Sequence, residues 1–165
     1  MGSVGIPESN AILRYLASVY KPELYPSEAN ARAVVDAALD WNVTNFYPHE
    51  VYGMGYMYVG YKDMDEAVLK ANEKKMLEQT LPYLEAKLSK QKFLGGDSLT
   101  IADFSFIGTY TFTLGNKAHR DALKAGKFPA FKSYIDRVTA AIPAMTAKDG
   151  SYSAFRGFCL AKGEQ

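Results

Sequence analysis

The sequence contains a single cysteine, Cys159, and no excess of charge of either sign. An internal disulfide needs two cysteines, so none can form within this chain, and a lone thiol is typical of a reducing compartment. Nineteen basic residues face eighteen acidic ones, for a net charge of +1, whereas proteins that bind nucleic acid usually carry a basic excess or stripe. We therefore expect an intracellular protein, in the cytoplasm or within an organelle complex, that binds no nucleic acid.

No run of eighteen apolar residues is present, so no membrane span is expected. The first residues also lack the basic and apolar regions of a signal peptide. Histidine is scarce, and the sequence has only His49 and His119. The two stand far apart, without a cysteine cluster or another histidine at ligand spacing. This predicts no metal site, and surface or loop positions for both histidines. Cys159 lies among aromatic residues with few basic neighbours, which predicts a buried and unreactive thiol.

Apolar residues recur at spacings of three and four, the repeat of an amphipathic helix. A first helix is predicted from an N-cap at Ser9 to a stop at Pro22. Its buried face would consist of Ala11, Ile12, Tyr15, Leu16 and Val19. A second helix, capped by Ser27, is predicted to end or kink at Pro48. Its apolar side would consist of Val34, Val35, Ala38, Leu39, Trp41 and Phe46.

A long amphipathic helix is predicted over residues 65–89, and Pro82 should bend or split it. Its buried side would consist of Val68, Leu69, Met76, Leu77, Leu81, Leu84 and Leu88. Further helices are expected over residues 119–124 and between Pro129 and Pro143. The tail is too aromatic for a disordered segment. The predicted fold class is therefore all-α, a single helical bundle of six or seven helices.

Residues 47–61 are unusually rich in tyrosine, methionine and glycine. We expect a loop that leads into an irregular helix, since a strand would stand alone in this chain. Tyrosine and methionine are favoured on adaptable and protein-facing surfaces, so this segment is expected to line an interface or a pocket. Core packing is the alternative. The residues proposed for the interface or pocket are Tyr52, Tyr56, Met57 and Tyr58.

The segment from Leu99 to Phe104 has the pattern of a well-defined helix start. Thr100 is placed as N-cap, and Asp103 stands at the third helical position, as in a capping box. Leu99 and Phe104 occupy the two positions of a hydrophobic staple. Aspartate replaces the usual glutamate or glutamine, yet it still places a carboxylate near the positive end of the helix.

Two motifs occur in a fixed order, Glu8-Ser9-x-Ala11-Ile12-x-x-Tyr15-Leu16 and Gly96-x-x-x-Thr100-x-x-Asp103, with a long helical segment between them. Together they resemble the cytosolic glutathione S-transferase family, in its theta-like classes. The segments "LYPSEANARAVVDAALDW" and "KFPAFKSYIDRV" are similar to two helices of that family's C-terminal domain. The resemblance implies a remnant of the thioredoxin-like domain, its last helix, in residues 1–20. Residues 21–165 would form the C-terminal-like helical domain.

The resemblance also implies a place for glutathione. In the family the residue matching Glu8 pairs with the γ-glutamyl amine, while the serine matching Ser9 holds its carboxylate, as a helix N-terminus suits an anion. Alternatively, Ser9 is only an N-cap and Glu8 is a solvated side chain. The cis-proline and the sulfur-activating residue of the thioredoxin-like domain have no counterpart in the sequence. We therefore expect no catalytic residue and no cofactor, with glutathione possible at a residual sub-site formed by Glu8 and Ser9.

Two functional classes remain open. The first is a structural or interaction subunit of a larger assembly, with a protein partner or a second copy of the chain as its contact. The second is part of an active glutathione transferase that conjugates glutathione to small electrophiles. A fold alone does not decide between them, and the missing catalytic residues favour the first.

Overall fold

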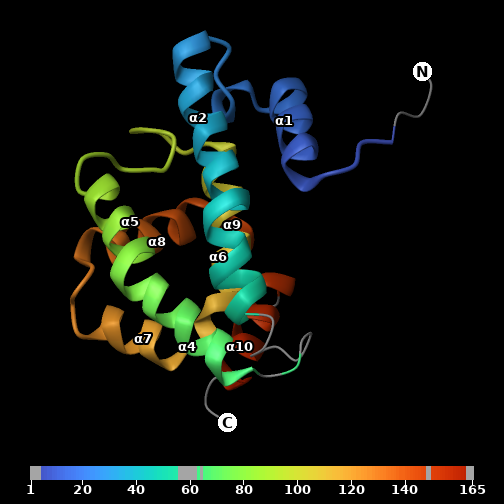
Figure 1. Ribbon diagram of the computed structural model, residues 1–165. Coiled ribbons are helices and arrows are strands. Elements are labelled where there is room, and N and C mark those ends of the chain that lie inside the picture. Colours follow the sequence, from blue (N-terminus) through green and yellow to red (C-terminus); the bar gives the residue numbers. More distant parts are fainter. Residues whose placement is uncertain (1–4, 56–62, 64, 148–149, 163–165) are drawn as a thin grey trace.

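The computed structural model describes residues 5–55, 63, 65–147 and 150–162, and it is a bundle of helices (Figure 1). Within these residues there is no β-strand, only an isolated bridge between Phe93 and Gly96. The elements are α1 (Ser9–Tyr20), η1 (Pro22–Leu24), α2 (Ala29–Trp41), η2 (Asn42–Gly55), α4 (Glu66–Lys75), η3 (Met76–Thr80), α5 (Leu81–Leu88), α6 (Ile101–Tyr110), η4 (Thr111–Gly115), α7 (Lys117–Lys124), α8 (Pro129–Ala141), α9 (Pro143–Thr146) and α10 (Ser151–Lys162). The predicted all-α fold is confirmed.

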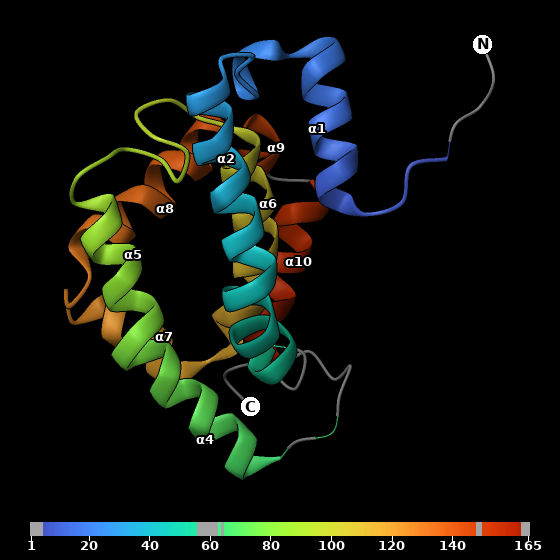
Figure 2. The ribbon, with the colours of Figure 1, turned by 45° about the horizontal axis from the view of Figure 1, so that its top comes forward.

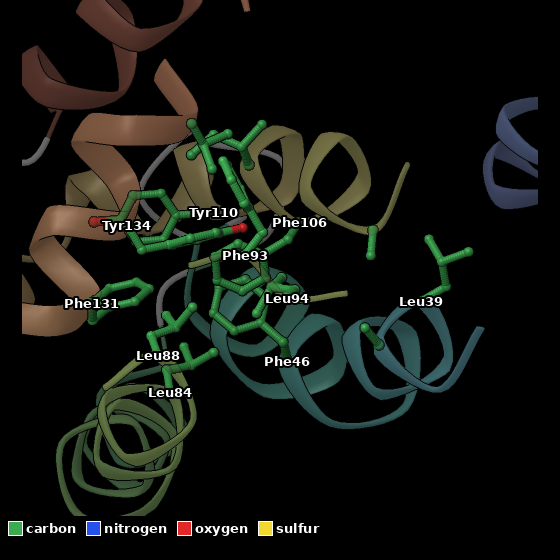
Figure 3. Packing of buried hydrophobic residues seen from close by; sticks show 14 of the residues in the cluster. Leu39, Phe46, Leu84, Leu88, Phe93, Leu94, Phe106, Tyr110, Phe131 and Tyr134 are labelled. Carbon is green, nitrogen blue, oxygen red and sulfur yellow. The ribbon is translucent and has the colours of Figure 1, made fainter. Parts of the chain in front are cut away.

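Helix α6 lies at the centre and contacts α1, α2, η2 and α8. Its sequence is mostly apolar, and six of its ten residues are buried, as is typical of a central helix. Phe106 packs against Phe46 with ring centroids 4.8 Å apart, and Tyr110 packs edge-on against Phe131 at 5.5 Å. Figure 3 shows these rings together with Tyr134 between the helices. The aromatic core therefore fixes α6, the helix on which the site described below depends.

The predicted capping box at the start of α6 is present, and Asp103 does more than cap. Its carboxylate accepts hydrogen bonds from the backbone N–H groups of Thr100 (2.8 Å) and Leu94 (2.9 Å) and from the Tyr134 hydroxyl (3.0 Å). Burial raises the pKa of Asp103, and these hydrogen bonds oppose that rise. Leu99 and Phe104 pack, partly buried, against the core. One carboxylate thus joins the 91–100 loop, α6 and α8.

Two other predicted caps are wrong. Helix α1 begins at Ser9 itself, with Glu8 in the N-cap position and no capping bond from its side chain. Helix α2 is capped by Glu28 rather than Ser27, because the longer carboxylate reaches the N–H groups of both Asn30 (2.9 Å) and Ala31 (2.7 Å). In both helices the N-cap therefore lies one residue from the serine that the sequence predicts.

Two prolines are accommodated by wide, π-type turns. The chain continues helically from α2 through Pro48 to Gly55 as η2, so the loop predicted after residue 47 is wrong and the irregular helix starts earlier. Pro82 divides the long helix as expected, since π-helical η3 precedes it and α5 begins with it in the first turn, where no N–H donor is needed. Val34 and Val68, predicted to be buried, are exposed.

The histidine prediction is wrong for His119, which is buried. Asn116 caps α7 and accepts from the His119 backbone N–H at 2.7 Å. The ring lies 3.0 Å from the Tyr110 hydroxyl through Nε2 and 3.0 Å from the Met76 sulfur through Nδ1. Burial lowers the pKa of His119 to about 3. His49 is half-buried in η2, with Nδ1 3.3 Å from Asn72 Oδ1.

Cys159 is buried in α10, as predicted, and burial raises the pKa of its thiol to about 11. No group of three potential metal ligands occurs among the described side chains. None of the helices in the described ranges has the length and apolar composition that a membrane crossing requires.

Candidate functional site

A cleft of about 740 Å³ lies between the start of α1 and the central helix α6, and we call it the α1–α6 cleft. Its volume is within the range of small-molecule sites. It is lined by Glu8, Ser9, Ile12 and Leu13 from the α1 segment, by Asn42, Val43 and Tyr47 from η2, and by Phe104, Ser105, Gly108, Thr109 and Phe112 from α6 and η4. Residues about a hundred positions apart in sequence therefore share one concave surface.

A chain of polar side chains holds α1 against the wall of this cleft. Ser105 donates to Asn10 Oδ1 at 2.8 Å and accepts from Asn42 Nδ2 at 3.0 Å. Thr109 donates to Asn42 Oδ1 at 3.2 Å. Asn42 is only 1% exposed, so it requires these bonds to offset the loss of water. The network positions the Glu8–Ser9 helix start relative to α6.

Sequence reasoning did not find this network. A signal was available, because Ser105 and Thr109 stand four residues apart in a mostly apolar helix and therefore share one face. Asn42 follows directly after the apolar stretch of α2. Polar residues at such positions usually have partners on another element.

Glu8 and Ser9 lie together at the edge of the cleft, and both are exposed. Glu8 has a φ of 71°, a left-handed conformation that costs a residue other than glycine about 1–3 kcal/mol. Because the Glu8 side chain makes no capping bond to α1, the positive end of the helix is left for a ligand in the cleft, beside that carboxylate. This arrangement suits a zwitterion, with its ammonium near Glu8 and its carboxylate near Ser9. Glutathione binding at these two residues stays a prediction.

The face of α1 that the sequence predicts to be buried is exposed instead. Ile12, Tyr15, Leu16, Val19 and Tyr20 form one face of the helix, called here the α1 face, and they are 40–68% exposed. The bundle is contacted instead by the other side, where Ala17 is buried and Leu13 packs against the core. Figure 2 shows α1 at the margin of the bundle. The α1 face is thus apolar and only partly covered by the described residues.

Helix α1 is held in place by Asp36 of α2. Its carboxylate accepts from Arg14 Nε at 2.8 Å and from the Tyr25 hydroxyl at 3.1 Å. Partly buried pairs of this kind restrict orientation more than they stabilise. The α1 face is therefore presented in a defined direction.

Part of the predicted site lies outside the described residues. Tyr52 lies in η2, but its side chain is outside the described part of the chain, as are Tyr56, Met57 and Tyr58. Their proposed role at an interface or pocket stays a prediction. Phe104 of the predicted staple, by contrast, also lines the α1–α6 cleft.

Comparison with known proteins places this chain in a family. Residues 46–141 match the model of the glutathione S-transferase C-terminal domain. A glutathione S-transferase of Arabidopsis thaliana is 33% identical over 132 residues, which cover 72% of this chain and 58% of the relative. GstB of Escherichia coli K12 is 32% identical over 111 residues, covering 66% of this chain and 52% of the relative.

Solved structures agree with the sequence match. A theta class glutathione S-transferase from Xanthomonas axonopodis pv. citri, with glutathione bound, is 26% identical and superposes with a TM-score of 0.63 over 82% of this chain and 68% of its own. An epsilon-class enzyme from the housefly, Musca domestica, shares the fold with a TM-score of 0.72 at 22% identity, over 96% and 69% of the two chains. The chain spans 52–58% of the length of the curated relatives named above. By the family model and by fold, it belongs to the cytosolic glutathione S-transferase family, whose all-helical C-terminal domain it contains.

Proposed function

We propose that this chain is a glutathione S-transferase-like structural or interaction module that contacts another protein, or a second copy of itself, through the α1 face. The observation that supports the proposal most strongly is the exposure of five large apolar side chains on one side of a well-positioned helix. Contiguous apolar patches are uncommon on monomers and usually mark interfaces.

Burial of the α1 face would contribute substantially to binding. Fully burying a large aliphatic side chain is worth about 1.5–3 kcal/mol, so covering the exposed half of each of these residues is worth about 1 kcal/mol apiece. An apolar groove of about 300 Å³, lined by Leu13, Leu24, Ile101 and Phe104 among others, extends the surface. A partner side chain inserted there would serve as an anchor.

We further propose that the chain does not conjugate glutathione by itself. Attack on an electrophile requires a thiolate, stabilised by a donor close to the sulfur. In the family that donor comes from the thioredoxin-like domain, whose last helix residues 1–20 resemble. Glu8 and Ser9 would hold the γ-glutamyl end of glutathione, which lies away from the sulfur.

The α1–α6 cleft supports a second candidate function, part of an active glutathione transferase. Phe104 and Phe112 give the cleft an apolar wall for an electrophile near Glu8 and Ser9. In this case the α1 face would be covered by a thioredoxin-like domain that supplies the missing contacts to glutathione.

Conjugation of glutathione to 1-chloro-2,4-dinitrobenzene separates the two candidates. We expect the pure chain to show no turnover above a boiled control, and no turnover when the thioredoxin-like domain of a relative is added. Turnover that appears only with the added domain, and that Ser9→Ala reduces, would establish the second candidate instead. Turnover by the chain alone would contradict the proposal of a non-catalytic module.

A further inference from the structure

The centre of the α1 face is free of charge. Its five side chains are aliphatic or aromatic, and they recur at helical spacing from Ile12 to Tyr20. Arg14 is the one charged residue within α1, and its Nε lies 2.8 Å from the Asp36 carboxylate of α2. Its charge is therefore directed to the bundle and away from the α1 face.

The two ends of the α1 face carry opposite charges. Glu8 precedes the first turn and is exposed, whereas Lys21 follows the last turn with 67% of its side chain exposed. The thirteen steps between them correspond to about 20 Å along a helix. Lys21 lies 3.5 Å from Glu23, but an exposed pair of this kind is worth little, so Lys21 can pair with a further carboxylate.

A surface with this pattern is complementary to a copy of itself turned by a two-fold axis. When two α1 helices are antiparallel, Glu8 of each copy lies near Lys21 of the other, and the uncharged centres meet. When they are parallel, each end meets an end of like charge, which is unfavourable. The net charge of +1 gives no strong long-range repulsion between copies.

The antiparallel arrangement also fixes which side chains oppose one another. When the pair is centred on the middle of the α1 face, Ile12 lies opposite Val19 of the second copy, and Tyr15 lies opposite its Leu16. Apolar side chains at spacings of three and four interdigitate in such helix pairs. The apolar groove of about 300 Å³ borders the C-terminal half of the face through Leu16 and Tyr20, so the first turns of the second helix pass beside it.

Given the proposed function, on which this step rests, we infer that the α1 face binds a second copy of the chain, with the two α1 helices packed antiparallel about a two-fold axis. A single helix pair is a small interface, at the weak end of the range for specific complexes. Monomer and dimer should therefore both be populated at micromolar concentration.

Cysteine cross-linking of the 165-residue chain tests the direction of the helices. Ile12→Cys and Val19→Cys are mixed and oxidised with diamide, and the linked peptides are identified by mass spectrometry. We expect the 12–19 disulfide to exceed the 12–12 and 19–19 disulfides at least about fivefold, because like positions of an antiparallel pair stand about 10 Å apart along the axis. Wild type is the control, since its Cys159 is buried and should not cross-link.

Charge reversal tests the pairing of the ends. Lys21→Glu should raise the dissociation constant of the dimer about fivefold, because two weak ion pairs of the assembly become repulsive. Adding Glu8→Lys should restore the wild-type value. Lys90→Glu makes the same change at an exposed residue outside α1, and it should leave the constant unchanged. Sedimentation equilibrium measures all four proteins.

The outcomes separate this inference from the proposed function. An excess of 12–12 and 19–19 disulfides over 12–19 would overturn the antiparallel pair, while the α1 face would still be an interface. Association that persists without any disulfide at positions 12 and 19 would overturn the inference, as would equal dissociation constants for Lys21→Glu and Lys90→Glu. A folded chain that stays at the 18.2 kDa monomer mass would overturn the inference and the proposed function together.

Discussion

Glu50 should make the protein less stable as the pH rises from acid to neutral. This glutamate is buried on η2, where one carboxylate oxygen accepts a hydrogen bond from the Thr80 hydroxyl of η3. The other oxygen has no hydrogen-bond partner among the described residues. Burial raises the pKa of Glu50 from 4.5 to about 7, although Thr80 and the charge of Lys75 both lower it.

The size and sign of the effect follow from proton linkage. One pKa unit corresponds to about 1.4 kcal/mol, so the rise from 4.5 to about 7 amounts to about 3 kcal/mol. Below pH 4.5 both the folded and the unfolded states carry a protonated Glu50. Between pH 4.5 and 7 the unfolded state loses its proton first, so the free energy of unfolding falls. Above pH 7 both states are ionised and the loss is complete.

Urea denaturation of wild type and Glu50→Gln between about pH 4 and 8 measures the effect. The difference between the two proteins cancels the titration of all other groups, and it should change by about 3 kcal/mol in favour of Glu50→Gln as the pH rises. Glu78→Gln, which replaces an exposed glutamate of η3, should show no such change. A difference that stays flat between pH 4.5 and 7 would refute the assignment of Glu50 as a buried, neutral acid.

Three further predictions concern the core. Asp103→Ala removes a cap and leaves buried donors unsatisfied, so it should lower stability by about 3 kcal/mol and the calorimetric midpoint by roughly 10 °C, whereas Asp97→Ala, at an exposed residue, should change the midpoint little. His119 has a folded pKa of about 3 against 6.5, so its stabilisation is present above pH 6.5 and is lost as the pH falls towards 3; NMR should show a neutral ring at about pH 4.5, and a charged ring there would contradict its burial. Cys159, with a thiol pKa of about 11, should react with Ellman's reagent only after urea is added. Fast reaction in native buffer would show that the thiol is accessible in the folded protein.

The fold class can be predicted from the sequence because the helix-start patterns and the apolar repeats both indicate helices. Thr100 and Asp103 define the start of α6 through local hydrogen bonds, which a sequence pattern can encode. Pro82 divides the long helix because it lacks an N–H group, whereas Pro48 lies inside the continuous helix η2. Such local signals were predictable in part, since the N-caps of α1 and α2 differ by one residue from the predicted Ser9 and Ser27.

Features that depend on distant partners were not. The apolar face predicted for α1 is correct as a pattern, but a pattern does not say which surface covers it, and Leu16 is exposed here. His119 is buried because Tyr110 and Met76, from other elements, surround its ring. The network around Asn42 joins three elements, and only the tertiary structure brings its members together.

Light scattering of the purified 165-residue chain tests most directly whether the α1 face is a protein interface. The account predicts a species heavier than the 18.2 kDa monomer at micromolar concentration. Tyr15→Asp combined with Leu16→Asp should return it to the monomer mass, because two unpaired charges would have to be desolvated at the contact. Ser18→Asp, at an exposed position on the same helix outside the α1 face, should leave the assembly intact. A folded wild-type chain that runs at 18.2 kDa without a partner would contradict the proposed function.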